Sequence, residues 1–300
     1  MQIGMIGLGK MGLNLMMNLR DNGVEVMGFD VNPNMIQCAK DLDLIVHDHL
    51  VDFIKAFVGR RIIWVMVPAG QITDNLINQL SDLCQAEDII IDGGNSFYQD
   101  SVRHAIQLKE KGIYFLDCGT SGGTSGARNG VCLMIGGEEV AFNVLKDTLI
   151  SISVVNGCLY AGKSGSGHYL KMVHNGIEYG MMQAIGEGFE VLEASEYDFD
   201  FEKVARVWNN GSVIRSWLIE LVEQSFKNDP KLEMITGASD SSGEAQWTVE
   251  RALAMKVPTP VISLSLMMRY RSKQSDTYAG KVVSALRNAF GGHSVTKKSP

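Results

Sequence analysis

The sequence predicts two domains of different fold class: a doubly wound α/β sheet over residues 1–160 and an all-α domain over residues 161–300. Three observations carry this prediction. Short apolar runs alternate with segments of helical periodicity in the first half, which is typical of a parallel sheet covered by helices. Only helical patterns follow residue 160. A chain of 300 residues is also too long for one ordinary hydrophobic core.

The composition is that of a globular protein without a polyanionic or membrane partner. Hydrophobic residues make up 45% of the chain and charged residues 20%. The net charge of -7 provides no overall attraction for nucleic acid or for a membrane surface. No targeting segment or membrane-spanning run is recognisable, so we expect a cytoplasmic protein. An odd number of cysteines without metal-ligand spacing predicts free thiols and no metal site: Cys38, Cys84, Cys118, Cys132 and Cys158.

The first predicted strand, residues 2–6, leads directly into a glycine-rich turn. A helix is predicted immediately afterwards, over residues 13–22. In a Rossmann-type fold, glycines at this spacing permit a tight turn, close approach of a pyrophosphate and packing of the helix on the strand. A glycine-rich turn without a nucleotide is the alternative, but the order of strand, glycines and helix favours a dinucleotide site. The GxGxxG pattern consists of Gly7, Leu8, Gly9, Lys10, Met11 and Gly12.

The second predicted strand, residues 24–29, is followed by Asp30. A carboxylate at this place accepts hydrogen bonds from the adenosine ribose hydroxyls and repels a 2'-phosphate. The next residues, Val31, Asn32 and Pro33, supply no arginine that could hold such a phosphate. The sequence therefore predicts NAD as the cofactor, with NADP as the weaker alternative.

The alternation of strands and helices continues to residue 160. Further strands are predicted at residues 62–67, 88–92, 113–117, 132–135 and 159–160, and helices at 72–83 and 101–111. Ligands of doubly wound sheets lie at the carboxyl ends of the strands. Three segments are expected there, at residues 67–70, 92–96 and 119–127. The first fits a simple turn, whereas the third has four glycines and four hydroxyl side chains, which suits an anion.

The helix predicted over residues 169–194 carries the candidate chemistry. Lys171, His174, Asn175 and Glu178 share one of its faces at helical spacing. Its other faces are apolar, which indicates a buried helix with one polar stripe. A solvated face is the alternative, but the histidine, the asparagine and the nearby glycines favour a site. More helices are predicted at residues 201–209, 213–227, 244–256, 261–270 and 276–289.

In these motifs the chain resembles the decarboxylating 6-phosphogluconate dehydrogenases, and the resemblance covers essentially its whole length. Two of the shared motifs, at residues 167–183 and 287–293, are specific. The resemblance implies a Rossmann-type domain followed by an all-helical domain, and oxidation of 6-phosphogluconate to ribulose 5-phosphate and carbon dioxide. It also implies a homo-oligomer, dimer or tetramer, of the short bacterial type. The motifs are GLGKMGLNL (7–15), DGGNS (92–96), GTSGG (119–123), GHYLKMVHNGIEYGMMQ (167–183) and RNAFGGH (287–293).

The same resemblance implies a role for each matching residue. Lys171 is the expected general base and acid, and Glu178 the acid that protonates carbon 1. The carboxylate and hydroxyls of the substrate are assigned to Asn95, Ser121, Gly122, Gly123, His174 and Asn175. The phosphate is assigned to Tyr179, Arg269, Arg287 and His293, the last two in a tail that reaches in from a neighbouring subunit. The expected cofactor contacts are residues 7–12, Asp30, Val67, Pro68 and Asn95.

This chain departs from the family pattern at two places. Long-form members usually have Asn-Arg-Thr where this chain has Asp30, Val31 and Asn32, which weakens any inference to NADP. A lysine or arginine commonly precedes the tryptophan of the GxGxW segment, whereas here Gln246 precedes Trp247. One contact to the substrate phosphate is therefore placed in doubt.

The residue types suit an oxidation followed by loss of carbon dioxide. An ordinary lysine has a pKa near ~10.4, so it must be desolvated to accept a hydroxyl proton. Once protonated, Lys171 can stabilise the enolate that remains after decarboxylation. Glu178 lies about 10 Å further along the helix axis and can act on another carbon. Two alternatives remain open: a non-decarboxylating β-hydroxyacid dehydrogenase of the 3-hydroxyisobutyrate type, and a non-catalytic NAD-sensing module.

Overall fold

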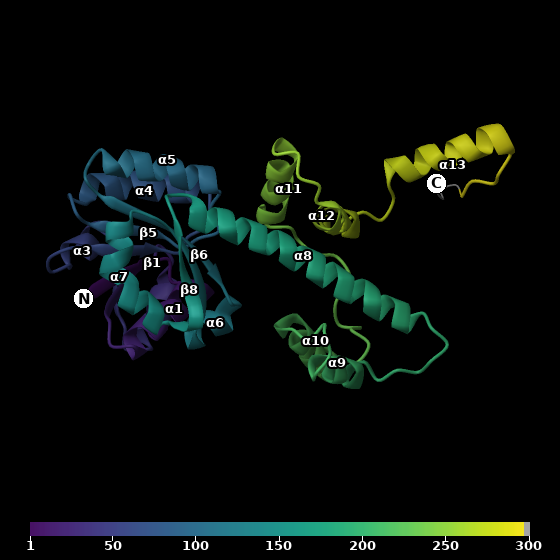
Figure 1. Ribbon diagram of the computed structural model, residues 1–300, viewed down its shortest axis with the longest axis horizontal. Coiled ribbons are helices and arrows are strands. Elements are labelled where there is room, and N and C mark those ends of the chain that lie inside the picture. The colour runs from purple at the N-terminus through teal and green to yellow at the C-terminus, as the bar shows by residue number, and fades with distance from the viewer. Residues whose placement is uncertain (297–300) are drawn as a thin grey trace. The chain divides into compact units, whose positions relative to one another are not determined.

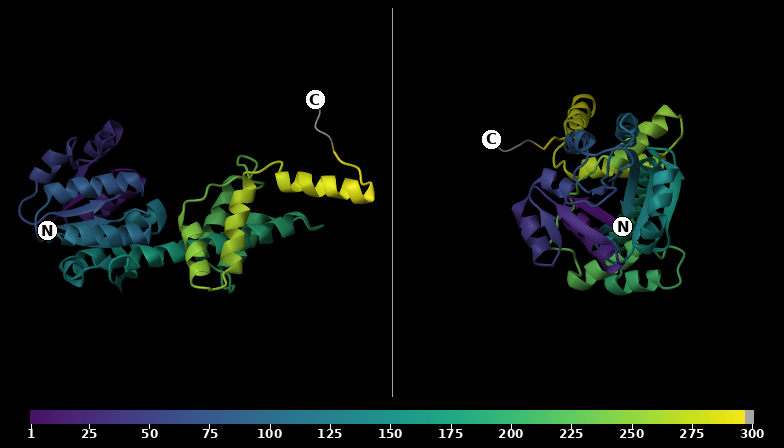
Figure 2. Two further views of the ribbon diagram at one scale, coloured as in Figure 1. Left: turned by 90° about the horizontal axis from the view of Figure 1, so that it is seen from above. Right: turned by 90° about the vertical axis from the view of Figure 1, so that its left-hand side faces the viewer.

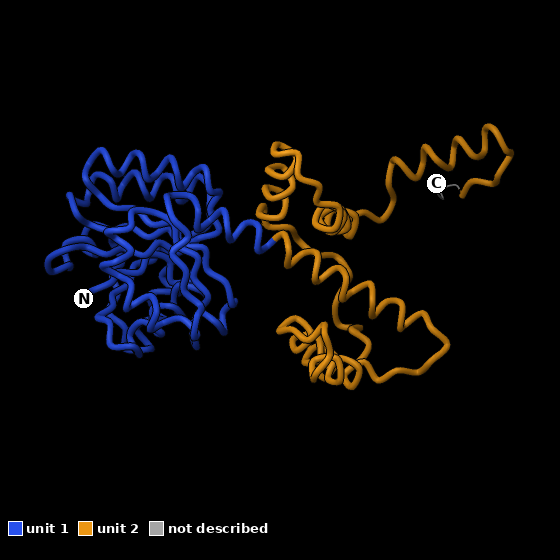
Figure 3. The backbone as a smooth tube through the Cα atoms, in the orientation of Figure 1, with its two compact units in different colours: residues 1–175 blue, residues 176–300 orange. Residues whose placement is uncertain are grey.

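The computed structural model describes residues 1–296, and the Lys297–Lys298 pair lies outside them. Two compact units divide the chain between Asn175 and Gly176 (Figure 3). This division falls inside one long helix, α8 (Ser166–Glu193), which therefore belongs partly to each unit. The predicted domain boundary near residue 160 stays a prediction.

The first unit is built on one eight-stranded sheet. β1 pairs with β2 on one side and with β4 on the other, both in parallel, so the strand order reverses at β1. Nucleotides bind at such a switch point in doubly wound sheets. In spatial order the strands are β3 (Ile45–His47), β2 (Glu25–Phe29), β1 (Gln2–Ile6), β4 (Ile62–Val65), β5 (Ile89–Asp92), β6 (Tyr114–Ser121), β7 (Val131–Gly137) and β8 (Ser153–Gly162).

One expectation about this sheet was wrong, because it is not wholly parallel. β6 and β7 run antiparallel, with Cys118 opposite Ile135 and Ser121 opposite Cys132. Residues 122–130 are the whole connection between the two strands, and they include the short helix α6 (Gly123–Asn129). A parallel crossover needs about a dozen residues or more, so this connection can only turn the chain back.

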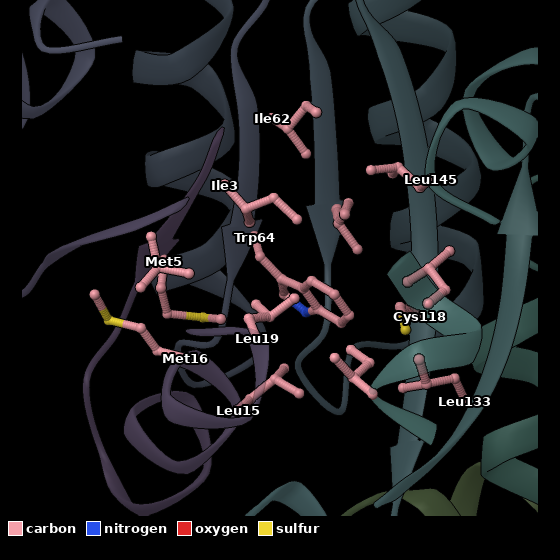
Figure 4. Packing of buried hydrophobic residues seen from close by; sticks show 14 of the residues in the cluster. Ile3, Met5, Leu15, Met16, Leu19, Ile62, Trp64, Cys118, Leu133 and Leu145 are labelled. Carbon is pink, nitrogen blue, oxygen red and sulfur yellow. The ribbon is translucent and has the colours of Figure 1, made fainter. Parts of the chain in front are cut away.

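Helices cover both faces of the sheet (Figure 1). Ile62 and Trp64 of β4 join one apolar cluster, whereas Ile63 and Val65 join the other, because successive side chains of a strand point to opposite faces. Trp64 is central to the first cluster (Figure 4). The first face is covered by α1 (Lys10–Asp21), α2 (Pro33–Lys40), α6 and α7 (Glu139–Ser151), and the second by α3 (Leu50–Lys55), α4 (Gln71–Leu83) and α5 (Tyr98–Lys109).

The second unit contains only helices among its described residues (Figure 2). Phe189 of α8 packs in one cluster with α9 and α10, and Tyr179 of α8 packs in another with α11 and α12. These are α9 (Phe201–Asn209), α10 (Trp217–Asn228), α11 (Glu244–Ala254), α12 (Pro260–Ser272) and α13 (Tyr278–Gly291). A sheet with helices on both faces, followed by an all-α part, confirms the predicted fold class.

Three further observations concern the cysteines, membrane-spanning helices and metal ligands. All five cysteines are free thiols. In the part of the chain that the structure describes, no helix is long and apolar enough to cross a membrane. Over the same residues, no three or more histidine, cysteine, aspartate or glutamate side chains gather as they would around a metal ion.

Candidate active site

The glycines of the turn after β1 have different surroundings. Gly7 has a φ of +93°, and a Cβ there would lie 2.4 Å from the Met66 carbonyl oxygen. A Cβ on Gly12 would lie 1.9 Å from the Gly7 carbonyl oxygen, so the start of α1 packs directly on the turn. Gly9 precedes α1 and faces open space, with nothing within 4 Å of its Cβ position. The turn therefore leaves room for a pyrophosphate at the start of a helix.

Asp30, which follows β2, is fixed beside this turn. Its Oδ2 accepts a hydrogen bond from the Leu8 N–H at 2.6 Å, and its Oδ1 accepts one from the Asn32 N–H at 2.8 Å. The neighbouring Val31 is 85% exposed. The Asp30 carboxylate is thus held next to the glycine turn, in the place expected for hydrogen bonds to the ribose hydroxyls.

The ends of β4 and β5 are packed against each other. Asp92 accepts a hydrogen bond from the Gly94 N–H at 3.1 Å, and a Cβ on Gly94 would lie 3.0 Å from the Val67 carbonyl oxygen. Pro68, which follows Val67, is held by a hydrogen bond from the Thr73 hydroxyl to the Pro68 carbonyl oxygen at 2.9 Å. Asn95 follows on the surface of this turn. The expected cofactor residues of the two turns are therefore neighbours at the carboxyl end of the sheet.

The segment 119–127, which was expected to be a loop, forms the end of a strand and most of a short helix. Its first residues continue β6, because Gly119 and Ser121 pair with β7. Gly122 then adopts a left-handed conformation with a φ of +114°, and α6 begins at Gly123. The first N–H groups of a helix have no partner within that helix, so the turn at Gly122 and the start of α6 keep donors that could meet an anion.

The first half of the polar stripe on α8 lies against the end of β6. The Ser121 hydroxyl is 3.2 Å from Nε2 of His174, whose Nδ1 is 3.0 Å from Oδ1 of Asn175. Lys171 is only 7% exposed. A Cβ on Gly119 would lie 2.4 Å from the Cβ of Lys171, so this close approach requires glycine at position 119. The structure thus brings four predicted substrate or catalytic residues together, of which Lys171 and Asn175 are buried and Ser121 and His174 partly buried.

Cys118 sits in the same strand, between Asp117 and Gly119, but it is no nucleophile. Its side chain is fully buried. Burial raises the pKa of the Cys118 thiol far above its ordinary value, so the thiol stays protonated and unreactive. Chemistry at this end of β6 therefore falls to the lysine and the hydrogen-bonding groups of α8.

The predicted phosphate residues of the second unit fall into two groups. The guanidinium of Arg269 lies 4.4 Å from the ring centroid of Tyr179, and the Tyr179 hydroxyl accepts a hydrogen bond from the Ser242 N–H at 3.2 Å. Arg287 on α13 and His293 beyond it are exposed, and no hydrogen bond or ring contact joins them to Tyr179 or Arg269 within the described residues. Glu178, next to Tyr179 on α8, is partly buried.

Two residues near these groups escaped the sequence reasoning. Glu244 opens α11, is 2% exposed, and has no hydrogen-bond partner for either carboxylate oxygen within residues 1–296. Asp117 is fully buried at the start of α8. The sequence did indicate Asp117, because this aspartate is the last residue of the predicted strand 113–117, as Asp92 is of the strand 88–92. Gln246, which was noted, is engaged by Glu250 and Tyr270 at 2.8 and 3.0 Å.

Both halves of the chain match families of known proteins. Residues 2–162 match the family described as "NAD binding domain of 6-phosphogluconate dehydrogenase", and residues 167–299 match "6-phosphogluconate dehydrogenase, C-terminal domain". YqeC of Bacillus subtilis, provisionally named as a 6-phosphogluconate dehydrogenase, is 54% identical over 99% of this chain and 100% of its own length. The NAD(+)-dependent, decarboxylating 6-phosphogluconate dehydrogenase of Haloferax volcanii is 41% identical over 99% of each chain.

Solved structures share the fold. The 6-phosphogluconate dehydrogenase of Plasmodium falciparum superimposes with a TM-score of 0.82 at 30% identity, covering 99% of this chain and 66% of its own. A 3-hydroxyisobutyrate dehydrogenase from Salmonella typhimurium reaches a TM-score of 0.75 at 18% identity, covering 90% and 93% of the two chains. The second likeness concerns the fold alone.

The surroundings of the glycines predict opposite effects of one added methyl group. Gly9→Ala should leave the melting temperature unchanged and weaken NAD binding about ten-fold or more, because the methyl enters the space left for the pyrophosphate. Gly12→Ala should lower the melting temperature by roughly 4 °C or more, because its Cβ collides with the Gly7 carbonyl. Thermal unfolding and fluorescence titration with NAD measure both effects. Wild-type affinity in Gly9→Ala would remove Gly9 from the site.

Proposed function

This chain belongs to the 6-phosphogluconate dehydrogenase family, and we propose that it oxidises and decarboxylates 6-phosphogluconate with reduction of NAD. The observation that carries the proposal is the burial of Lys171 against Gly119, beside the hydrogen-bonded Ser121, His174 and Asn175. This arrangement combines a buried lysine with groups that can orient a polyhydroxy acid. A cytoplasmic location is part of the proposal, supported by the free thiols.

Lys171 is proposed as the base of the first step. NAD, when bound at the glycine turn, supplies the acceptor for the hydride that leaves carbon 3. Lys171 accepts the hydroxyl proton from the same carbon, so the alcohol becomes a ketone. The burial of Lys171 supports this role because it keeps the step away from bulk water.

The second step uses the proton that Lys171 has just gained. The substrate carboxylate is β to the new ketone, so its carbon–carbon bond can break with electrons flowing to the carbonyl oxygen. The Lys171 ammonium stabilises that developing negative charge in a site with little water. Glu178 is proposed to protonate carbon 1 of the resulting enediol, and its place on α8, two helical turns after Lys171, suits an acid that acts on a different carbon.

The remaining residues are proposed to hold the substrate. Ser121, His174 and Asn175 already form one hydrogen-bonded row, and we assign them, with Asn95, Gly122 and Gly123, to the carboxylate and hydroxyls. Tyr179 and Arg269 are assigned to the phosphate. Their stacking supports this, because the ring holds a guanidinium that can pair with a phosphate through two parallel hydrogen bonds.

NAD rather than NADP is proposed from Asp30. The Haloferax relative is named as NAD(+)-dependent, whereas the Plasmodium enzyme was solved with NADP+, so relatives of both kinds exist. In this chain two backbone N–H groups hold the Asp30 carboxylate in place. A fixed negative charge there repels a 2'-phosphate and accepts from ribose hydroxyls, which favours NAD.

An oligomer is proposed from α13. None of its residues is buried, and its exposed apolar side chains include Tyr278, Leu286 and Phe290. An amphipathic helix without a covered face is stabilised by packing on another surface. We propose that α13 packs on a second copy of the chain and carries Arg287 and His293 to the phosphate of that copy.

Turnover tests the proposal directly. With NAD, the protein should form NADH and carbon dioxide from 6-phosphogluconate, and no NADH from 3-hydroxyisobutyrate. Lys171→Met should lower kcat by at least about a thousand-fold because the base is lost, while NAD affinity stays within about two-fold. Lys163→Met makes the same change at an exposed lysine and should keep full activity. NADH from 3-hydroxyisobutyrate alone would make the protein a non-decarboxylating dehydrogenase, and NAD binding without turnover of either acid would make it a sensing module.

Cofactor preference should follow the charge at the end of β2. Asp30→Asn combined with Val31→Arg should raise the ratio of kcat/KM for NADP to that for NAD by about ten-fold or more. The change removes a repelling carboxylate and adds a guanidinium at a position that is already exposed. Val31→Arg alone is the control and should have a smaller effect, because the carboxylate remains. An unchanged ratio in the double variant would show that Asp30 does not read the ribose.

The tail proposal predicts a link between assembly and substrate binding. Phe290→Asp should shift the sedimentation coefficient toward that of a monomer and lower kcat/KM for 6-phosphogluconate by about ten-fold, since a charge opposes burial of α13. Ser284→Asp adds the same charge to another face of α13 and should change neither quantity. A monomeric wild type with full activity would contradict the proposal.

A further inference from the structure

The start of α8 is held by a carboxylate that belongs to the sheet. Oδ1 of Asp117 accepts a hydrogen bond from the Gly165 N–H at 2.6 Å, and Oδ2 accepts one from the His168 N–H at 2.9 Å. Asp117 is fully buried in β6. The first N–H groups of a helix have no partners within the helix, and a negative charge near them is favourable. Asp117 therefore caps α8, although it lies some fifty residues earlier in the chain.

Two glycines, Gly136 and Gly167, allow this helix end to lie directly on the backbone of the sheet. A Cβ on Gly167 would lie 2.4 Å from the Asp117 carbonyl oxygen and 2.5 Å from that of Met134. A Cβ on Gly136 would lie 2.7 Å from Oδ1 of Asp117 and 2.7 Å from the Gly167 nitrogen. No side chain separates the helix from the strands here, so the first turn of α8 has very little freedom to shift.

A second anchor comes from α5. Nδ1 of His168 lies 2.7 Å from the Ser101 hydroxyl, and both residues are buried. His168 is thus held twice, at its backbone by Asp117 and at its ring by Ser101. The two anchors come from different elements of the first unit, so they constrain both the position and the rotation of the helix.

The strand that contains Asp117, β6, also contacts Lys171. Gly119 follows Asp117 by two residues in β6, and its Cβ position lies 2.4 Å from the Cβ of Lys171. Lys171 follows the anchored His168 by one helical turn. A slip of α8 by one residue would move the amine about 1.5 Å along the axis, and misplacement on that scale can cost ~100-fold in rate.

We infer that Asp117 is a positioning residue for Lys171. Its buried carboxylate holds the start of α8 so that the amine of Lys171 stands at the reacting hydroxyl. The inference rests on the proposed function, because it assigns Asp117 to the reaction through Lys171. Asp117 itself is not assigned any contact with substrate or cofactor.

Asp117→Asn tests this inference against a matched control. The amide has the same shape, but its NH2 group cannot accept one of the two N–H bonds. Asp88→Asn makes the same change at an equally buried aspartate, which accepts from the Arg61 and Gln85 N–H groups and pairs with the Arg61 side chain at the opposite end of β5. Both variants should lose stability. Only Asp117→Asn should lower kcat, by at least about ten-fold, with KM for NAD within about two-fold of wild type.

Amide hydrogen exchange supplies a readout that does not depend on activity. Residues 165–175 should exchange at least about ten-fold faster in Asp117→Asn than in Asp88→Asn, because only the first change releases the helix start. Wild-type kcat in Asp117→Asn, or an equal fall of kcat per folded molecule in both variants, overturns the inference. Equal exchange in both variants overturns it as well.

Two outcomes need a further measurement: an inactive wild-type protein, and an Asp117→Asn variant that does not fold. If the wild-type protein does not turn over 6-phosphogluconate, the proposed function fails, and hydrogen exchange alone decides whether Asp117 anchors α8. If Asp117→Asn does not fold, Ser101→Ala removes the other anchor, and kcat should fall about three-fold with KM for NAD unchanged. An unaltered kcat in Ser101→Ala would then overturn the inference.

Discussion

The candidate chemistry of this protein depends on direct backbone contact between β6, β7 and the start of α8. Side chains are missing at Gly119, Gly136 and Gly167, and each of these positions would otherwise collide with the opposite element. The contact brings a helix end within reach of Asp117, which satisfies N–H groups that would be costly to leave unpaired in a buried place. The helix stripe is consequently held against the carboxyl end of the sheet, where doubly wound folds bind their ligands.

Anionic ligands must be bound by local positive groups, because the overall charge of the chain is negative. The chain has a net charge of -7, yet the proposed substrate and cofactor are anions. Buried or stacked cations can meet this need, because a positive charge in a site with little water acts more strongly than one on the surface. Arg269, which carries a permanent positive charge, is stacked on Tyr179. The buried carboxylate of Glu244, which has no hydrogen-bond partner among residues 1–296, is destabilising, and we have no physical account of it.

Local patterns predicted most elements of the fold, and the exceptions have physical causes. The strand at residues 2–6 and the helix at residues 201–209 were predicted with their observed ends, since buried apolar runs and helical periodicity bound them clearly. The helix α2 was not predicted, although Asn32 caps it and Pro33 begins it. Segment 119–127 was misjudged, because its glycines serve close packing and a turn instead of an open loop.

By itself the sequence determined the fold class, the glycine turn and the polar stripe, because each of these is a pattern among neighbouring residues. It did not determine the direction of β7, which depends on a connection too short for a crossover. Nor did it reveal that Asp117 caps α8 or that Lys171 is seated on Gly119. Those features were decided by the tertiary structure, since they join residues some fifty positions apart, and their physical basis is burial and contact rather than local periodicity.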